Sequence, residues 1–370
     1  MDWAPIGSRI VCIERGNGAM TQFTIGGRAI GADHPAFVIA EVGINHNGEL
    51  AKAVEMIQVA RRAGADAVKF QTFKADEFVG DPAQLFTYRS RGQDVTEPMI
   101  DMFRRCELPN GAWREIAAEC RRQGIIFMST PQNRSDLDLL LEFDIPAIKI
   151  GSDDFTNLPL IRSYASTGLP LILSCGMSDL GEVYQALDAA GAFDGHSVAL
   201  LLCTSRYPTP PSDVNLRKLK TLRSAFPGLA VGFSDHTQGP LASSLAVAMG
   251  AVIFEKHFTL DHDLPGPDHW FSENPGSLEL WISGIRTARV MLGEALVRPT
   301  AHEQEMRLIA RRSVVALSAI GKGTRLTAAN VGVRRPGTGL PPSFLEAFLG
   351  SVAVRDISAG QVLDFWDVRK

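Results

Sequence analysis

Short apolar runs alternate with amphipathic segments eight times between residues 36 and 292, and this alternation constrains the fold more than any other feature. Buried strands of a parallel sheet have such short, continuous apolar runs, whereas helices space their apolar residues three and four positions apart. Eight strands that each precede a helix predict an α/β fold, the (β/α)8 or TIM barrel. The predicted strands cover residues 36–40, 67–70, 125–128, 147–150, 169–173, 198–202, 230–232 and 252–254. The predicted helices cover residues 50–63, 112–123, 135–143, 158–167, 179–190, 215–226, 240–249 and 277–292.

The chain divides into four predicted parts. Residues 1–20 mix charged residues with glycines and lack the apolar core of a signal peptide, so we interpret them as a loosely attached extension. Residues 21–292 form the predicted barrel, and the polar segment 293–312 is interpreted as a linker that ends in a basic turn. Residues 313–370 contain short apolar runs separated by Gly and Pro, which predicts a small β-rich domain.

The charge and composition of the chain argue against two classes of partner. The formal net charge of −4 over 370 residues gives no electrostatic reason to expect nucleic acid or an anionic membrane. No apolar run approaches the ~18 residues of a membrane span. The five cysteines are scattered without a CxxC pair, which favours reduced thiols in a cytoplasmic protein. Cys175 and Cys203 end apolar runs and are interpreted as small core residues, with a place in the lining of a site as the alternative.

Polar residues follow the predicted strands with unusual regularity. In a barrel of this kind the catalytic groups lie at the carboxyl ends of the strands. The polar positions at these ends lie near residues 41, 69–72, 129–130, 149–154, 174–178, 203–207, 234–236 and 255–257. The long segment from residue 72 to residue 109, between the second and third predicted strands, is expected to project over the same face as a lid or a substrate contact.

Lys69 and Lys149 lie at strand positions whose side chains face the barrel interior. Lysine is rarely buried without an anionic partner. Together with neighbouring hydroxyl groups, the two lysines predict a pocket for a phosphate and a carboxylate. The hydroxyl groups belong to Thr130, Ser152, Ser174 and Ser205. The alternative is a structural ion pair of each lysine with Glu41 or Asp154.

His236 and His257 stand at the ends of the seventh and eighth predicted strands, beside Glu255. Two imidazoles that converge next to carboxylates can hold a divalent cation whose other ligands are waters. Two histidines without a third strong ligand are too few for a structural zinc site, so we expect Mn²⁺, with Mg²⁺ or Co²⁺ as alternatives. Asp268, in the loop after the eighth strand, is placed to meet a substrate hydroxyl or a metal-bound water.

The motifs at the strand ends, in this order, resemble those of the sialic acid synthase family. They are AEVGINHNG, KFQT, STP, KIGSDDFTNLPL, SCGMS, CTSRYPTPP, GFSDHT, EKHFTL and GPDHW, and the resemblance runs from about Phe37 to the C-terminus. It implies a barrel synthase joined to a C-terminal antifreeze-like (SAF) domain, which is matched by RRS at residues 311–313, RPG at 335–337 and LP at 340–341. It also implies a domain-swapped homodimer, in which the small domain of one subunit covers the barrel mouth of the other.

The resemblance also assigns roles to individual residues. Positions that surround phosphoenolpyruvate are matched by Lys69, Gln71, Thr130, Lys149, Ser152, Ser174, Ser205, Tyr207 and Ser234. The metal ligands are matched by His236 and His257. Positions around the metal waters and the acceptor sugar are matched by Glu41, Asp154, Glu255, Asp268 and Arg335. The catalytic residues that this implies are Glu41, Lys69, Lys149, Glu255 and Asp268.

The activity that the resemblance implies is the condensation of phosphoenolpyruvate with an N-acyl-mannosamine-type sugar aldehyde, giving a nonulosonic acid and phosphate. Asp153 and Asp154 depart from the residues common in bacterial synthases. The identity of the acceptor sugar therefore stays open, since shortening a carboxylate side chain by one methylene changes the discrimination between substrates by ~1–3 kcal/mol. A 2,4-diamino-6-deoxy sugar, leading to legionaminic or pseudaminic acid, is therefore an alternative acceptor. Another phosphoenolpyruvate aldol-type synthase and a metal-dependent barrel hydrolase are alternatives among enzymes, and a non-catalytic glycan-binding protein is an alternative of another class.

Overall fold

The computed structural model describes residues 23–370, so the predicted extension at residues 1–20 lies outside the described residues. The chain forms two units, which divide between Gly293 and Glu294. The first unit holds the predicted barrel and the second holds the small C-terminal domain. Among the described residues, we find no helix with the length and apolar character needed to cross a membrane.

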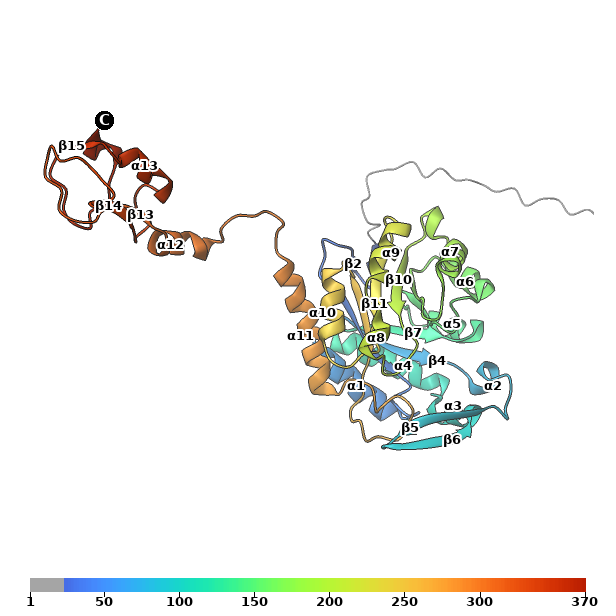
Figure 1. Cartoon of the computed structure of the whole chain (residues 1–370). Coiled ribbons are helices and arrows are strands. Elements are labelled where there is room, and N and C mark those ends of the chain that lie inside the picture. The colour runs from blue at the N-terminus through green and yellow to red at the C-terminus, as the bar shows by residue number, and fades with distance from the viewer. Residues whose placement is uncertain (1–22) are drawn as a thin grey trace, which may run out of the picture. The chain divides into compact units, whose positions relative to one another are not determined.

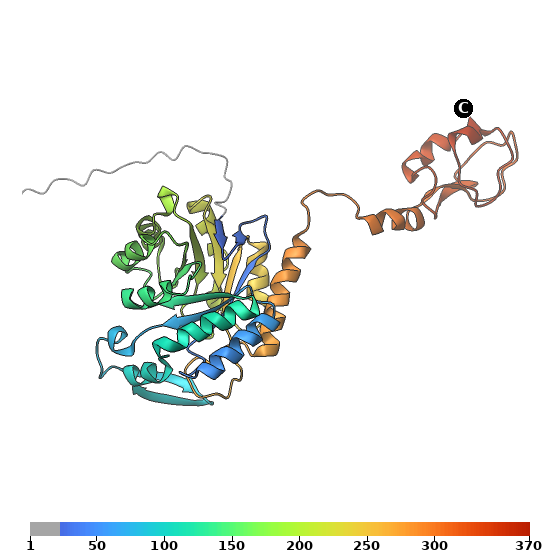
Figure 2. The same cartoon turned by 180° about the vertical axis from the view of Figure 1, so that it is seen from behind.

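Eight parallel strands form the barrel of the first unit (Figures 1 and 2). They are β3 (Phe37–Gly43), β4 (Ala67–Thr72), β7 (Ile126–Pro131), β8 (Ile148–Ile150), β9 (Leu171–Ser174), β10 (Val198–Cys203), β11 (Ala230–Ser234) and β12 (Ile253–His257). Hydrogen bonds join them in the order β7-β4-β3-β12-β11-β10-β9-β8, and the end strands β7 and β8 lie next to each other. The barrel is therefore nearly closed, which confirms the predicted fold.

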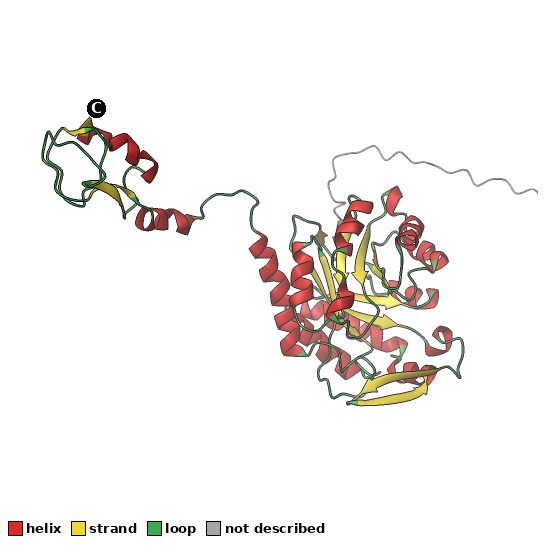
Figure 3. Cartoon of the chain, viewed as in Figure 1, coloured by secondary structure: helices red, strands yellow, loops and turns green. Residues whose placement is uncertain are grey.

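Helices surround the strands (Figure 3). They are α1 (Leu50–Arg62), α4 (Asn110–Gln123), α5 (Arg134–Leu141), α6 (Leu158–Ala165), α7 (Leu180–Ala189), the 3₁₀ turn η1 (Ala192–Asp194), α8 (Pro211–Val214), α9 (Lys218–Ala225), α10 (Leu241–Ala248) and α11 (Pro275–Leu292). Alternate strand residues face the two sides of the sheet, so Val38 and Val68 pack against helices while Ile39 and Ala67 fill the barrel interior. The main core therefore lies between strands and helices.

Several strands extend beyond their predicted carboxyl ends. The prediction used apolar runs, whereas β7 continues to Pro131 and β12 continues to His257. Of the added residues that are polar and buried, Thr130, Glu255 and His257 face a cavity, and Lys256 faces an ion pair. Hydrophobic patterning alone therefore ends each strand where the polar site begins.

A short hairpin closes the amino end of the barrel and was not predicted. Its strands are β1 (Phe23–Ile25) and β2 (Arg28–Ile30), and their apolar side chains pack on the interior residues at the start of the barrel strands. Asp66 anchors this end, because it pairs with Arg28 of the hairpin and lies 2.7 Å from Arg286 of α11.

The segment that was predicted to project over the site folds into its own small structure. It contains α2 (Ala75–Phe78), the antiparallel strands β5 (Leu85–Ser90) and β6 (Gln93–Pro98), and α3 (Met99–Cys106). Phe73, Phe78 and Phe103 hold it together through ring contacts at 4.9–6.2 Å between centroids. Phe78 and Phe103 also reach the cavity described below.

The second unit contains short strands and turns around its own apolar core. Its elements are α12 (Ala301–Ala310), β13 (Ser313–Ala316), β14 (Val331–Arg334), η2 (Pro342–Phe344), α13 (Leu345–Phe348), β15 (Val352–Ala353), η3 (Phe365–Asp367) and β16 (Val368–Arg369). Part of the predicted linker is thus helical. The signal is local: Thr300 caps α12 and Glu303 completes a capping box.

Candidate active site

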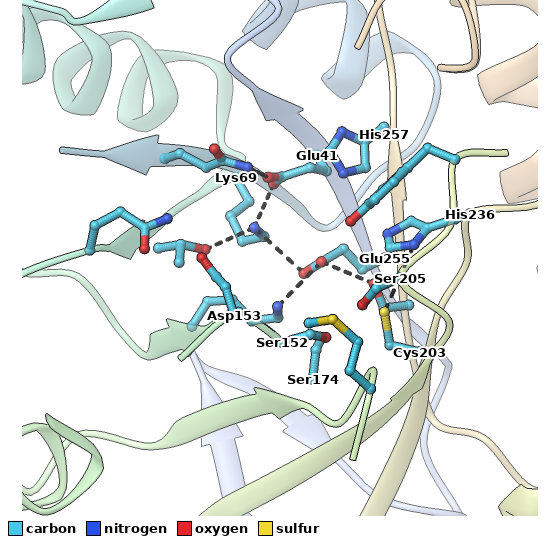
Figure 4. A pocket seen from close by; sticks show the side chains of 18 of the residues that line it. Glu41, Lys69, Ser152, Asp153, Ser174, Cys203, Ser205, His236, Glu255 and His257 are labelled. Atoms are coloured by element: carbon cyan, nitrogen blue, oxygen red, sulfur yellow. Dashed lines mark hydrogen bonds and ion pairs between the residues drawn. The ribbon is translucent and has the colours of Figure 1, made fainter. Parts of the chain in front are cut away.

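The carboxyl ends of all eight barrel strands, with the loops that follow them, surround a cavity of about 310 Å³ (Figure 4). Its lining contains most of the predicted site residues. They are Glu41, Lys69, Gln71, Thr130, Lys149, Ser152, Ser174, Ser205, Tyr207, Ser234, His236, Glu255 and His257. The fold therefore gathers residues from distant parts of the sequence into one site.

Strand register explains why these side chains meet. Glu41 on β3 is in register with Lys69 on β4 and with His257 on β12. Ser234 on β11 is in register with Glu255 on β12. Residues in register on neighbouring parallel strands point to the same face of the sheet, so these side chains form one layer inside the barrel.

An ionic network occupies the floor of the cavity, with Lys69 between Glu41 and Glu255 in Figure 4. Lys69 Nζ lies 2.7 Å from Glu41 Oε2 and 3.8 Å from Glu255 Oε2, and it donates to Thr130 Oγ1 at 3.0 Å. Lys149 Nζ lies 3.4 Å from Glu255 Oε1. Both lysines thus have carboxylate partners, and for Lys149 the partner is Glu255, which the sequence did not suggest.

Burial shifts the proton affinities of this network. It raises the pKa of Glu41 to about 7, although the charge of Lys69 acts in the opposite direction. Burial alone would raise the pKa of Glu255 as well, but Lys149 and Lys69 outweigh it and lower that pKa. Burial opposes the charge of Lys69, but Glu255 and Glu41 raise its pKa above the ordinary value. Glu41 is therefore the carboxylate best able to exchange a proton near neutral pH.

A hydroxyl group beside the lysines has no protein partner. Ser174 Oγ is buried and makes no hydrogen bond within the described structure, and Glu255 Oε2 likewise accepts none. Ser152 Oγ accepts a hydrogen bond from the Gly176 N–H at 3.0 Å. A buried hydroxyl without a partner costs free energy, so Ser174 is suited to hydrogen-bond a ligand in the cavity.

The two histidines face each other across the next strand pair. Their ring centroids are 5.5 Å apart, and the Tyr207 ring lies tilted against the His236 ring with 4.2 Å between centroids. His236 Nδ1 lies 2.8 Å from Thr204 O, so this nitrogen donates and Nε2 is left as an acceptor. His257 Nδ1 is buried without a hydrogen bond, with Asp268 Oδ2 at 3.7 Å.

Three predicted residues lie apart from the lining. Asp154 is half-buried and accepts a hydrogen bond from Asn157 Nδ2 at 3.0 Å. Asp268 lies behind His257, and burial raises its pKa to about 6. Arg335 is exposed in the second unit, whose position relative to the barrel is not determined.

Other lining residues were not predicted as part of the site. They are Phe78, Phe103, Gln132, Gly151, Asp153, Met177 and Cys203. Cys203 was interpreted as a core residue with the site lining as the alternative, and the alternative holds, because Cys203 faces the cavity with its Sγ 3.8 Å from His236 Nδ1. Its place at the end of β10 was the available signal, because every strand end contributes to the site. Phe78 and Phe103 reach it from the lid segment, which carries no motif for them.

Comparison with protein-family models matches residues 56–296 to the NeuB family and residues 311–369 to the SAF domain. The chain belongs to the NeuB family. This confirms the family expected from the strand-end motifs, and the second match confirms the small domain.

Individual relatives agree with this membership. N,N'-diacetyllegionaminic acid synthase of Legionella pneumophila is 39% identical to this chain over 91% of the chain and 95% of the relative. N-acetylneuraminate-9-phosphate synthase of Homo sapiens is 33% identical over 81% of this chain and 83% of the relative. The crystal structure of N-acetylneuraminic acid synthetase from Leptospira borgpetersenii has a TM-score of 0.69 and 32% identity, covering 78% of this chain and 96% of that chain.

Proposed function

We propose that this protein condenses phosphoenolpyruvate with an N-acyl-mannosamine-type sugar aldehyde, giving a nonulosonic acid and inorganic phosphate. One observation carries the proposal: two buried lysines and an unpartnered buried serine line one cavity together with a pair of histidines. A small phosphorylated acid needs such a set of cationic and hydroxyl donors. Relatives named as nonulosonic acid synthases support the same reaction class.

Lys69, Lys149 and Ser174 are the proposed donors to the phosphate and carboxylate of phosphoenolpyruvate. Glu41 and Glu255 lie close enough to the two lysines to balance their charges. Each lysine ammonium group can donate three hydrogen bonds. It can therefore bind an anionic ligand while it keeps its ion pair with the carboxylate. Gln71, Thr130, Ser152, Ser205, Tyr207 and Ser234 complete the proposed surround.

A divalent cation fits the histidine pair. The lining holds two lysines and three carboxylates, Glu41, Asp153 and Glu255, so its formal charge with neutral imidazoles is −1. A cation bound beside the substrate would offset the negative charge of these carboxylates. The proposed ligands are His236 Nε2 and His257, whose Nδ1 makes no hydrogen bond, and Mn²⁺ is the proposed ion. Among residues 23–370, no group of three His, Cys, Asp or Glu side chains is arranged to hold a metal, which suits an exchangeable ion with water ligands.

A neutral imidazole can bind a metal ion, whereas a protonated one must first lose its proton. The pKa shifts of His257 and His236 run in opposite directions in this respect. Burial, followed by the charge of His236, lowers the pKa of His257 well below its ordinary value and keeps that ring neutral. Burial acts in the same direction on His236, but Cys203 outweighs it and raises the pKa. Metal binding at His236 therefore displaces a proton, so affinity falls in acid.

In the proposed mechanism, a divalent cation held by His236 and His257 would supply Lewis-acid polarisation of the aldehyde oxygen of the sugar. The lysines and Ser174 orient phosphoenolpyruvate so that its C3 attacks the aldehyde carbon, which forms the new carbon–carbon bond and leaves C2 electron-poor. Glu41, with its pKa of about 7, accepts a proton from the water that adds to C2. Glu41 passes this proton to the former aldehyde oxygen, which becomes a hydroxyl group. The tetrahedral carbon then expels phosphate, which leaves with the second proton of the water, and a 2-keto acid remains. Glu255 stays ionised between the lysines and holds them in place.

A 2,4-diamino-6-deoxy sugar is a second proposed acceptor. The relative from Legionella pneumophila, at 39% identity, is named as a synthase of N,N'-diacetyllegionaminic acid, and the human relative at 33% acts in the neuraminate series. The sugar side of the site is proposed to include Asp154, Asp268 and Arg335, the last from the partner subunit of a domain-swapped homodimer. A cytoplasmic location is proposed as well, because the four described cysteines are free.

The direct test is phosphate release by the purified full-length chain with Mn²⁺, phosphoenolpyruvate and one sugar at a time. The panel contains N-acetylmannosamine, its 6-phosphate and 2,4-diacetamido-2,4,6-trideoxymannose, and product mass is measured. We expect one sugar to give phosphate and a nonulosonic acid in equal amounts, and Lys149→Met to abolish both. Phosphate release that does not depend on any sugar, or no release with all three, contradicts the proposal.

A further inference from the structure

A buried ionic cluster lies on the outer face of β11 and β12, directly behind the two histidines. Side chains alternate along a strand, so Asp235 and Lys256 face the helices while their neighbours His236 and His257 face the cavity. Lys256 Nζ lies 3.1 Å from Asp235 Oδ2 and 3.3 Å from Glu273 Oε1. All three side chains are at most 7% exposed, so their charges interact with each other far more than with water.

Hydrogen bonds attach Asp235 to the surrounding loop and helices. Its Oδ1 accepts from the N–H and the hydroxyl of Thr237 at 2.8 and 2.7 Å, and its Oδ2 accepts from Ser243 Oγ at 2.6 Å. Ser243 on α10 in turn accepts from Trp281 Nε1 of α11 at 2.8 Å. The carboxylate at the tip of β11 is therefore fixed to two outer helices.

Glu273 connects the cluster to His257. Its backbone N–H donates to His257 O at 2.9 Å, and its Oε1 accepts from the Gly239 N–H at 2.8 Å. Lys256 Nζ donates to Gly239 O at 2.9 Å. The backbone that carries one histidine and the loop that follows the other are thus held by the same three charged residues.

Few backbone hydrogen bonds between β11 and β12 hold the two strand tips together. Register pairs join Phe233 to Phe254 and Ser234 to Glu255, and one more hydrogen bond runs from the Asp235 N–H to Glu255 O at 2.8 Å. Both histidines lie beyond these pairs, at the strand tips. The ion pair of Asp235 with Lys256 ties the two tips together beyond the last register pair between β11 and β12, although β12 remains paired with β3 at His257.

We propose that Lys256, with Asp235 and Glu273, is a positioning group that sets the separation of His236 and His257 and thereby the affinity of the metal site. The inference rests on the proposed function, because it assumes that the two histidines hold a divalent ion. The cluster does not touch that ion, since its side chains lie on the far side of the strands. It acts through the backbone of the two residues that carry the imidazoles.

Mn²⁺ binding to the full-length chain tests this role, measured by electron paramagnetic resonance as the fraction of Mn²⁺ that stays free. Lys256→Met removes the ammonium group, and Glu273→Gln removes one charge but keeps an acceptor for the Gly239 N–H. We expect the Kd for Mn²⁺ to rise roughly tenfold or more in both variants, as for other groups that orient metal ligands.

Arg286→Met is the matched control. It breaks an ion pair of the half-buried Arg286 with the buried Asp66, 2.7 Å long, at the opposite end of the same barrel, and it leaves the histidines untouched. We expect this variant to lose thermal stability while its Kd for Mn²⁺ stays at the wild-type value. If the cluster served stability alone, Lys256→Met and Glu273→Gln would behave like Arg286→Met, with lower thermal stability and an unchanged Kd for Mn²⁺.

Wild-type Mn²⁺ affinity in Glu273→Gln would overturn the inference, whatever happens to its melting temperature. This milder variant carries the test if Lys256→Met does not fold. A wild-type chain that binds no Mn²⁺ would overturn the histidine site and the inference with it. Intact Mn²⁺ binding without sugar-dependent phosphate release would instead overturn the proposed reaction and leave the positioning role standing.

Discussion

At the amino end of the barrel, Ile39, Met128 and Ile172 fill the interior with apolar side chains. Two positions further along the same strands, Glu41, Thr130 and Ser174 line a polar cavity. Because side chains alternate along a strand, two positions are a single step on the inward face. Along each of these strands, the apolar residue that stabilises the fold and the polar residue that lines the cavity are therefore consecutive inward-facing positions.

The two ends also carry charge in different ways. At the amino end, Asp66 pairs with Arg28 and Arg286 at the margin of the barrel. At the carboxyl end, Lys69 and Lys149 lie inside it, at most 3% exposed. Burying a charge inside a barrel costs free energy, so the two lysines at the carboxyl end are best explained by a ligand that they bind.

The largest expected effect comes from removing a histidine at the carboxyl end. His236→Ala should lower the Mn²⁺-dependent rate of phosphate release roughly a thousandfold or more, because polarisation of an aldehyde by a metal contributes several kcal/mol. Its melting temperature should stay close to wild type. Full turnover of this variant in a chelated buffer would defeat the metal assignment.

The amino end should show the reverse pattern. Ile25 of the hairpin is fully buried, and Ile25→Ala should lower the free energy of unfolding of the barrel by about 2–5 kcal/mol through the cavity it leaves. The turnover number at 25 °C should not change. Denaturant titration and a rate measurement on the same preparation check both statements, and a large fall in turnover of the folded variant would break the division between the ends.

Arg335 extends the comparison to the second unit. Arg335→Ala should raise the KM for the sugar roughly tenfold, the usual cost of a hydrogen bond from a charged group. The KM for phosphoenolpyruvate should stay within experimental error of wild type. Arg334→Ala, one residue earlier and also exposed, is the control. Equal increases in the two KM values for Arg335→Ala would count against its place in the sugar site.

Asp153 should give the smallest effect. Its exposed carboxylate adds negative charge to a lining that is proposed to receive an anion. Asp153→Asn should therefore lower the KM for phosphoenolpyruvate by about two- to fivefold, since an exposed charge contributes at most about 1 kcal/mol. Steady-state kinetics at low and high salt measure this effect, which should shrink as salt screens the charge. A higher KM in Asp153→Asn would show that the carboxylate assists binding.

Much of this architecture could be predicted because strand patterning and barrel geometry are strongly linked. Once eight strands are expected, their carboxyl ends must meet, and Lys69, Lys149, His236 and His257 follow from their positions alone. The amino-terminal hairpin could not be predicted this way, because its strands are three residues long and too short for a periodic signal. Lys256, whose charge is buried behind the site, was passed over because its neighbours Glu255 and His257 explain the polar strand end.

Phosphoenolpyruvate should bind beside an ion held by His236 and His257. The most direct measurement of this is ³¹P relaxation of phosphoenolpyruvate in the presence of Mn²⁺. A paramagnetic ion within a few ångströms of the cavity should strongly enhance relaxation of the phosphate signal with the wild-type chain. In His236→Ala the enhancement should disappear while phosphoenolpyruvate still binds to the lysines. Equal relaxation in the two proteins would contradict the account.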